Sequence, residues 1–200
     1  MTRIVLIGLI ALLLAPVYAQ KSNRRELGWD LTYRSVLARN NVGRDEWLWK
    51  WLGPKYHSPA KPLIDGWQGK LILSSILIDA PAPHAGEPYT IWLVRTKDDA
   101  YHWEFVKGKR PYNTKEPMKP QAYDQLFATI SSWQQAKPVK PEDTPVGAVP
   151  GYMGFLSLYD HGKSRQMLLT LEDFWQCDNK KCDGGKGGRL TQAMELLPHN

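Results

Sequence analysis

Apolar residues recur at helical spacing between residues 120 and 135, and this is the clearest pattern along the chain. Positions three or four apart share one side of an α-helix, so the pattern predicts an amphipathic helix that packs against a core. Asp124 and Gln125 belong to its polar side. The apolar positions are Tyr123, Leu126, Phe127, Ile130 and Trp133.

The N-terminal part of the chain predicts a pair of helices. Apolar residues keep helical spacing over residues 29–39, and two asparagines then favour a stop. A second helix is predicted over 45–52, with acidic residues in its first turn and Gly53-Pro54 after its end. The tryptophans at 47, 49 and 51 would also suit a strand, but the Gly-Pro stop favours the helix. Residues 53–69 are predicted as a loop.

Several segments rich in β-branched and aromatic residues predict strands joined by tight turns. Lys97-Asp98-Asp99 and Asp160-His161-Gly162-Lys163 have the composition of hairpin turns. The sequence therefore predicts an antiparallel sheet of about five strands. These strands are expected at 70–79, 89–94, 101–106, 152–159 and 165–171.

The C-terminal part predicts short helices. Thr170-x-x-Asp173 resembles a capping box that opens a short helix running into Cys177, and residues 190–197 are apolar enough for a terminal helix. The Gly- and Lys-rich stretch 184–188 is expected to be a flexible loop, and the proline-rich stretch 137–150 a surface connection. The fold class is therefore α+β: the five-strand sheet, an N-terminal helix pair, one central amphipathic helix and short C-terminal helices.

The first nineteen residues have the pattern of a secretory signal peptide. Arg3 precedes an apolar run from Ile4 to Leu14, and small residues at 17 and 19 suit cleavage after Ala19. A membrane-spanning helix needs roughly twenty apolar residues, and this run is too short. We therefore expect a signal peptide at 1–19, a single domain at 20–200 with no transmembrane segment, and a periplasmic or secreted protein.

The chain contains two cysteines, Cys177 and Cys182. In an oxidising compartment a nearby pair usually forms a disulfide, which is the favoured interpretation here. A thioredoxin-like redox centre has two intervening residues rather than four, and a zinc site needs further thiols or histidines. Redox and metal roles remain the alternatives.

The charge of the chain suits an anionic partner without requiring one. The formal net charge is +6, and loss of Arg3 with the signal peptide lowers it to +5. Such an excess fits a protein partner or an anionic polymer of the cell envelope. Nucleic acid is excluded as a partner because the chain is exported. The sequence predicts no cofactor and no metal site.

No motif in the sequence indicates a catalytic site. The glycine-rich stretch 184–188 lacks the Ser or Thr that follows the lysine of a P-loop, and no G-x-S-x-G elbow occurs. His102 and Glu104, two residues apart on a predicted strand, share one face and could form an acid–base pair. A hydrolase assembled from distant residues would use these two and His161.

Tryptophan is unusually frequent, with nine in the chain, and three fall between 47 and 51. On a helix Trp49 points about 200° away from its neighbours, so one stripe cannot bury all three rings. This predicts an exposed tryptophan, Trp49 above all, in a partner-binding surface. The residues of that surface would be Arg44, Trp47, Trp49, Lys50 and Trp51.

Taken together, these patterns favour an exported, non-catalytic binding protein. An inhibitor or an immunity-type protein acting in the cell envelope would have these properties. The alternative is a small envelope hydrolase whose site is assembled from distant residues.

Overall fold

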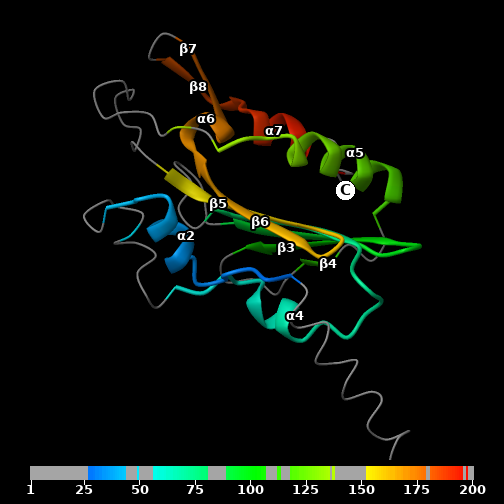
Figure 1. Cartoon of the computed structure of the whole chain (residues 1–200). Coiled ribbons are helices and arrows are strands. Elements are labelled where there is room, and N and C mark those ends of the chain that lie inside the picture. Colours follow the sequence, from blue (N-terminus) through cyan, green and yellow to red (C-terminus); the bar gives the residue numbers. More distant parts are fainter. Residues whose placement is uncertain are drawn as a thin grey trace, which may run out of the picture.

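In the computed structural model, a β-sheet and several helices pack together around one core (Figure 1). It describes residues 27–43, 49, 56–80, 89–106, 112–113, 118–135, 137, 152–178, 181–195 and 197. The predicted signal peptide and nearly all of the proline-rich connection lie outside the described residues. So do Arg44, Trp47, Lys50 and Trp51 of the predicted partner-binding surface.

The centre of the molecule is an antiparallel sheet with the strand order β4-β3-β2-β1-β5-β6. β4 has only two residues, so five strands of full length carry the sheet, which confirms the predicted α+β class. The strands are β1 (Ser74–Ala80), β2 (Tyr89–Arg95), β3 (Ala100–Val106), β4 (Tyr112–Asn113), β5 (Tyr152–Asp160) and β6 (Lys163–Thr170).

Helices cover both faces of this sheet (Figure 1). On one face lie α5 (Pro120–Ser131), α6 (Leu171–Phe174) and α7 (Arg189–Met194); on the other lie α2 (Arg34–Arg39) and α4 (Lys61–Asp65). Every residue of β1 is buried because this strand is central and covered on both sides. The near-continuous apolar run in its sequence reflects that position.

The amphipathic helix predicted at 120–135 is confirmed as α5. Pro120 stands in its first turn, where its missing N–H is not needed, and the buried face carries Tyr123, Leu126 and Ile130. Just after the helix, the Gln135 side chain forms paired hydrogen bonds with the backbone of Leu168, at 2.8 and 2.9 Å. These bonds satisfy polar groups on the outer edge of β6, which an unpaired edge strand would leave exposed.

The N-terminal helix is shorter than its periodicity predicts, because local hydrogen bonds hold the first residues in a turn. The carboxylate of Asp30 accepts hydrogen bonds from Thr32 and Ser35, and the indole of Trp29 donates to the Leu158 carbonyl at 3.1 Å. α2 therefore begins at Arg34. The predicted loop 53–69 contains a helix, α4, which has Pro62 in its first turn.

The C-terminal segment corrects two expectations. Half of the capping box is present: the Asp173 carboxylate accepts a hydrogen bond from the Thr170 backbone N–H at 2.6 Å, whereas the Thr170 hydroxyl donates to the same carboxylate oxygen at 3.2 Å. However, α6 ends at Phe174, and the chain continues as the hairpin β7 (Trp175–Asp178) and β8 (Lys181–Gly187). The glycine-rich stretch is thus mostly strand rather than a flexible loop.

Cys177 and Cys182 are register partners in this hairpin. Directly opposed residues of an antiparallel pair are neighbours across the two strands. The register is therefore compatible with the disulfide, which stays a prediction. Among the described residues, no helix is long and apolar enough to cross a bilayer.

Candidate functional site

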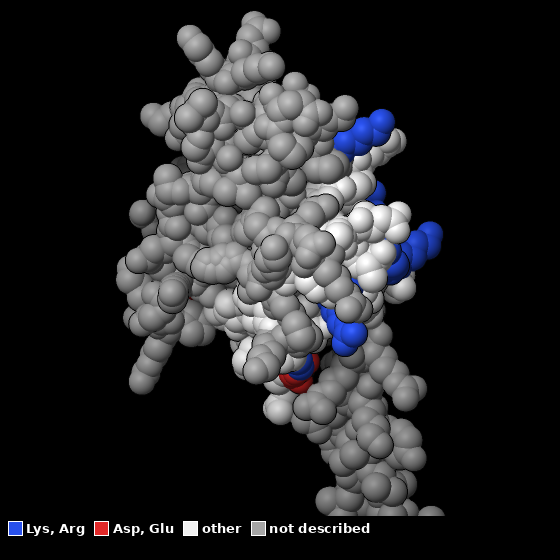
Figure 2. All heavy atoms as spheres, turned by 90° about the vertical axis from the view of Figure 1, so that its left-hand side faces the viewer, with Lys and Arg blue, Asp and Glu red and all other residues white. Residues whose placement is uncertain are grey.

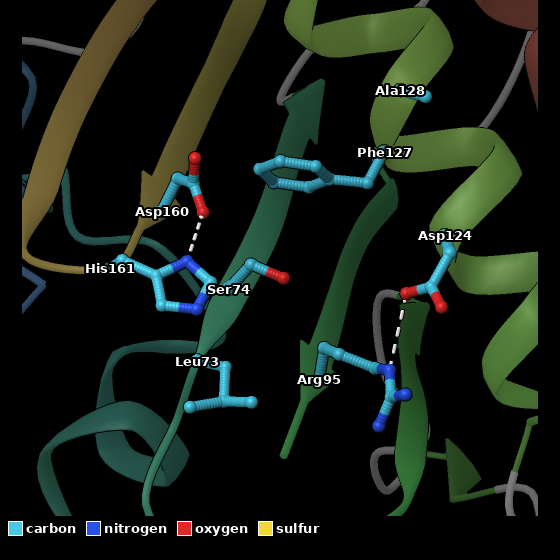
Figure 3. A pocket seen from close by; sticks show the side chains of 8 residues that line it. All are labelled: Leu73, Ser74, Arg95, Asp124, Phe127, Ala128, Asp160 and His161. Atoms are coloured by element: carbon cyan, nitrogen blue, oxygen red, sulfur yellow. Dashed lines mark hydrogen bonds and ion pairs between the residues drawn. The ribbon is translucent and has the colours of Figure 1, made fainter. Parts of the chain in front are cut away.

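A hollow of about 290 Å³ lies between one end of the sheet and the flank of α5 (Figure 3). It combines apolar and charged side chains from four separate segments of the chain. Leu73 and Ser74 come from the start of β1, Arg95 from the end of β2, and Asp160 and His161 from the end of β5. α5 contributes Asp124, Phe127 and Ala128, which are three and four residues apart and share one side of the helix.

The hollow lies where the apolar core beneath α5 gives way to a row of polar residues on adjacent strands. Within the core, Leu93, Ile76 and Leu158 are register partners on three adjacent strands. Two residues further along, the same face of the sheet carries Arg95, Ser74 and Asp160 as register partners. Ser74 is small and buried, so the row leaves open space beneath α5 where a larger residue would fill it.

Arg95 fixes one wall of the hollow. Its Nε donates to Asp124 Oδ1 at 3.1 Å, which links the sheet to α5. Its Nη1 donates to the carbonyls of the β2–β3 turn, those of Thr96, Lys97 and Asp99. The Arg95 side chain is 18% exposed whereas that of Asp124 is 57% exposed, so the carboxylate faces solvent and the guanidinium faces inward.

Asp160 and His161 form the opposite wall. His161 Nδ1 lies 2.6 Å from Asp160 Oδ1, and both side chains are more than half exposed. His161 and Gly162 have φ values of 42° and 85°, as the two central residues of a type I′ hairpin require. The His161 N–H also donates to the Leu73 carbonyl at 2.8 Å. The turn therefore holds the imidazole at the rim.

A buried hydroxyl lies behind the hollow. Tyr123 is fully buried, and its hydroxyl has no hydrogen-bond partner of ordinary geometry among the described residues. Burial raises the pKa of this hydroxyl. Four residues that line the hollow lie close enough to modify that pKa: Ser74, Asp124, Asp160 and Arg95. Tyr123 does not itself line the hollow.

The acid–base pair that the sequence predicts lies elsewhere. His102 and Glu104 are on β3, and His102 belongs to the row of Leu93 and Ile76. β2 and β1 separate it from β5, which amounts to about 14 Å of sheet at about 4.8 Å per strand. His102 is buried, and burial lowers its pKa. The structure therefore brings His161 together with Asp160 and not with His102 and Glu104.

Trp49 is half-buried rather than exposed. It adopts a helical conformation and packs against a cluster formed by Tyr33, Val36, Leu37, Val42, Tyr152, Phe155 and Leu168. This cluster lies on the sheet face that α2 covers. Since the other residues of the predicted partner-binding surface lie outside the described part, that surface stays a prediction.

Packing in the protein interior accounts for several of the other tryptophans. Trp92 and Trp103 stack across β2 and β3 with ring centroids 4.9 Å apart, and Trp67 closes over both edge-on. The Trp92 indole N–H donates to Ser75 at 2.8 Å. These rings form a core on the α4 side of the sheet.

The side of the molecule that bears α2 has a basic edge in its described part. Figure 2 shows lysine and arginine side chains projecting along one edge of this side, with little acidic surface among the residues coloured there. Arg34 and Arg39 of α2 are exposed. Among the described residues, no group of three histidine, cysteine or acidic side chains is arranged to hold a metal ion.

Of the residues that line the hollow, the sequence indicated only one as a candidate site residue. His161 was a candidate, whereas Ser74, Arg95, Asp124 and Asp160 carried no motif. Their proximity depends on strand register and on the rotation of α5 about its axis. Comparisons with protein-family models, with characterised proteins and with solved structures found no match to this chain.

Proposed function

We propose that this chain is an exported, non-catalytic binding protein that acts in the periplasm or outside the cell, as an inhibitor or immunity-type protein does. The observation that carries the proposal is the hollow beneath α5. Two contacts, Arg95–Asp124 and Asp160–His161, hold its polar side chains in place on strands, a hairpin turn and a helix. A concave site that combines apolar side chains with a few charged groups suits recognition. The signal-peptide pattern supports export.

Capture of a partner by the mature chain, residues 20–200, tests this proposal. Ala128 is exposed at the mouth of the hollow, whereas Gln125 is exposed elsewhere on the same helix. An envelope component retained by the parent should be lost with Ala128→Trp, which occludes the hollow, and kept with Gln125→Trp. Equal retention by both variants would refute the hollow as the contact site.

A second candidate, a small hydrolase, is favoured by one feature of the hollow. A carboxylate at 2.6 Å orients the His161 imidazole, and Ser74 lines the same space. Such a dyad could activate a serine as nucleophile. A fluorophosphonate probe that labels Ser74, with loss of labelling in His161→Asn, would establish this activity. Asn tolerates the left-handed backbone, so the variant keeps the turn. The binding proposal predicts no labelling.

Export itself is tested by the precursor. Ala19→Arg should leave an unprocessed chain in the membrane fraction, because the peptidase requires a small residue there. Normal processing and release of this variant would contradict the signal-peptide assignment.

A further inference from the structure

The size of the hollow limits what it can hold. Sites for whole small-molecule ligands usually enclose roughly 300–1,000 Å³. At about 290 Å³, and open to solvent on the side of Asp124 and His161, this hollow matches a single long side chain or a group of that size. In protein interfaces, one such anchor in a pocket often supplies much of the binding energy.

The charged groups of the hollow favour a ligand that donates hydrogen bonds. With histidine counted as neutral, one arginine faces two carboxylates. The Nε and Nη1 groups of Arg95 are committed to Asp124 and to three backbone carbonyls, which leaves Nη2 outside these bonds. By contrast, Asp124 and Asp160 each commit only the Oδ1 atom to their pair. The remaining carboxylate oxygens favour a cationic donor.

The apolar part of the lining adds a second requirement. The half-buried Phe127 ring projects from α5 toward the Asp160 side of the hollow, and Leu73 lies on the sheet side (Figure 3). Apolar surface of this kind packs against methylene groups, and an aromatic face attracts a cation above it. A planar guanidinium satisfies both demands, because it can stack on the ring and donate two bonds to one carboxylate.

We infer that the hollow receives an arginine side chain presented by a protein partner. This inference rests on the proposed binding function and adds the chemistry of the ligand to it. The guanidinium lies against Phe127 and donates to Asp160 and Asp124, and the methylene stem packs over Leu73 and Ala128.

The test uses a minimal probe with a neutral counterpart. Acetyl-arginine amide is titrated into the isotope-labelled mature chain, and backbone amide resonances are followed by NMR. Acetyl-citrulline amide has nearly the same shape without the charge, and acetyl-glutamate amide has the opposite charge. The arginine probe should shift the resonances of residues 73–74, 95, 124–128 and 160–161, and bind about tenfold more tightly than the citrulline probe.

Matched variants locate the effect. Asp160→Asn and Asp124→Asn should each weaken binding of the arginine probe about three- to tenfold, because each removes a partly exposed charge. Glu172→Gln removes an exposed carboxylate on α6, next to Thr170, at the opposite end of the sheet. That control should leave the affinity unchanged.

Three results would overturn the inference: equal binding of the arginine and citrulline probes, preference for the glutamate probe, or no shifts in the hollow with the arginine probe. If any of these occurs while Ala128→Trp still abolishes partner capture, the ligand class is wrong and the binding function stands. If the arginine probe binds as expected but Ala128→Trp captures the partner as the parent does, the hollow is not the contact site and the inference fails. Capture of no partner by the parent chain would instead refute the proposed function.

Discussion

Asp79 on β1 is fully buried on the side of the sheet that faces Tyr33 and Tyr56, and we expect it to control stability. Three hydroxyl groups donate to its carboxyl: Tyr33 at 3.0 Å, Tyr56 at 2.8 Å and Thr90 at 2.9 Å. No ion pair to this carboxyl is found among the described residues. Burial raises its pKa above the ordinary value, although the hydroxyl groups act in the opposite direction.

Two substitutions separate the hydrogen bonds from the charge. Asp79→Ala removes the common acceptor and leaves two buried hydroxyls and the partly buried Tyr56 hydroxyl without it, at about 1–3 kcal/mol each, so we expect a loss of at least about 3 kcal/mol in the free energy of unfolding. Asp79→Asn keeps the size and one acceptor oxygen and removes the ionisable group. Its loss at acidic pH should be much smaller than that of Asp79→Ala.

The dependence on pH follows from the raised pKa. The folded protein holds the Asp79 proton more tightly than the unfolded chain does. The resulting stabilisation is fully present below the unfolded pKa of 3.8 and is lost as the pH rises through the folded pKa. The stability of the parent relative to Asp79→Asn should therefore fall over this window, by about 1.4 kcal/mol for each unit that separates the two pKa values.

Urea unfolding at pH 4 to 8, followed by tryptophan fluorescence, measures both effects, since Trp92 and Trp103 are buried in the fold. A loss below about 1 kcal/mol for Asp79→Ala would refute the role of the hydroxyl groups. A difference between the parent and Asp79→Asn that does not change with pH would refute the effect of burial on the pKa.

Three further predictions concern single positions. Protein recovered from its own compartment should contain no thiol that reacts under denaturing alkylation, because Cys177 and Cys182 are paired; two reactive thiols would contradict the disulfide. Trp49→Ala should lower the free energy of unfolding by about 1–3 kcal/mol in the same urea assay, because the ring is half-buried; an unchanged value would instead restore the exposed ring that the sequence predicts. Gly154→Ala should lower it by about 1–3 kcal/mol, because a Cβ there would stand 2.7 Å from the Asp79 carbonyl oxygen; a neutral effect would show that β1 can yield.

Most of the fold could be predicted because local pattern and tertiary structure agree in its main elements. α5 has a strict helical period, and the β5–β6 hairpin has a turn sequence that matches its backbone. The sequence failed where polar contacts override periodicity. Residues 29–33 have helical spacing, but the Asp30 carboxylate holds them in a turn. The β7–β8 hairpin is rich in lysine and glycine, which strands ordinarily disfavour.

The hollow could not be predicted in the same way. Ser74, Arg95 and Asp160 are register partners, but register depends on how the strands pair across long connections. Asp124 meets Arg95 only because α5 packs with its Tyr123 face toward the sheet. His161 alone could be noticed, since it occupies a hairpin-turn position where asparagine or glycine is usual.

The most direct test of the binding function is photo-crosslinking in the organism that produces the chain. A photoreactive phenylalanine derivative is placed at Ala128, at the mouth of the hollow, and in a separate variant at Glu172, at the far end of the sheet. We expect a covalent adduct with a protein of the same compartment from position 128 and none from position 172. Adducts from position 172 alone, or the same adducts from both positions, would contradict this expectation.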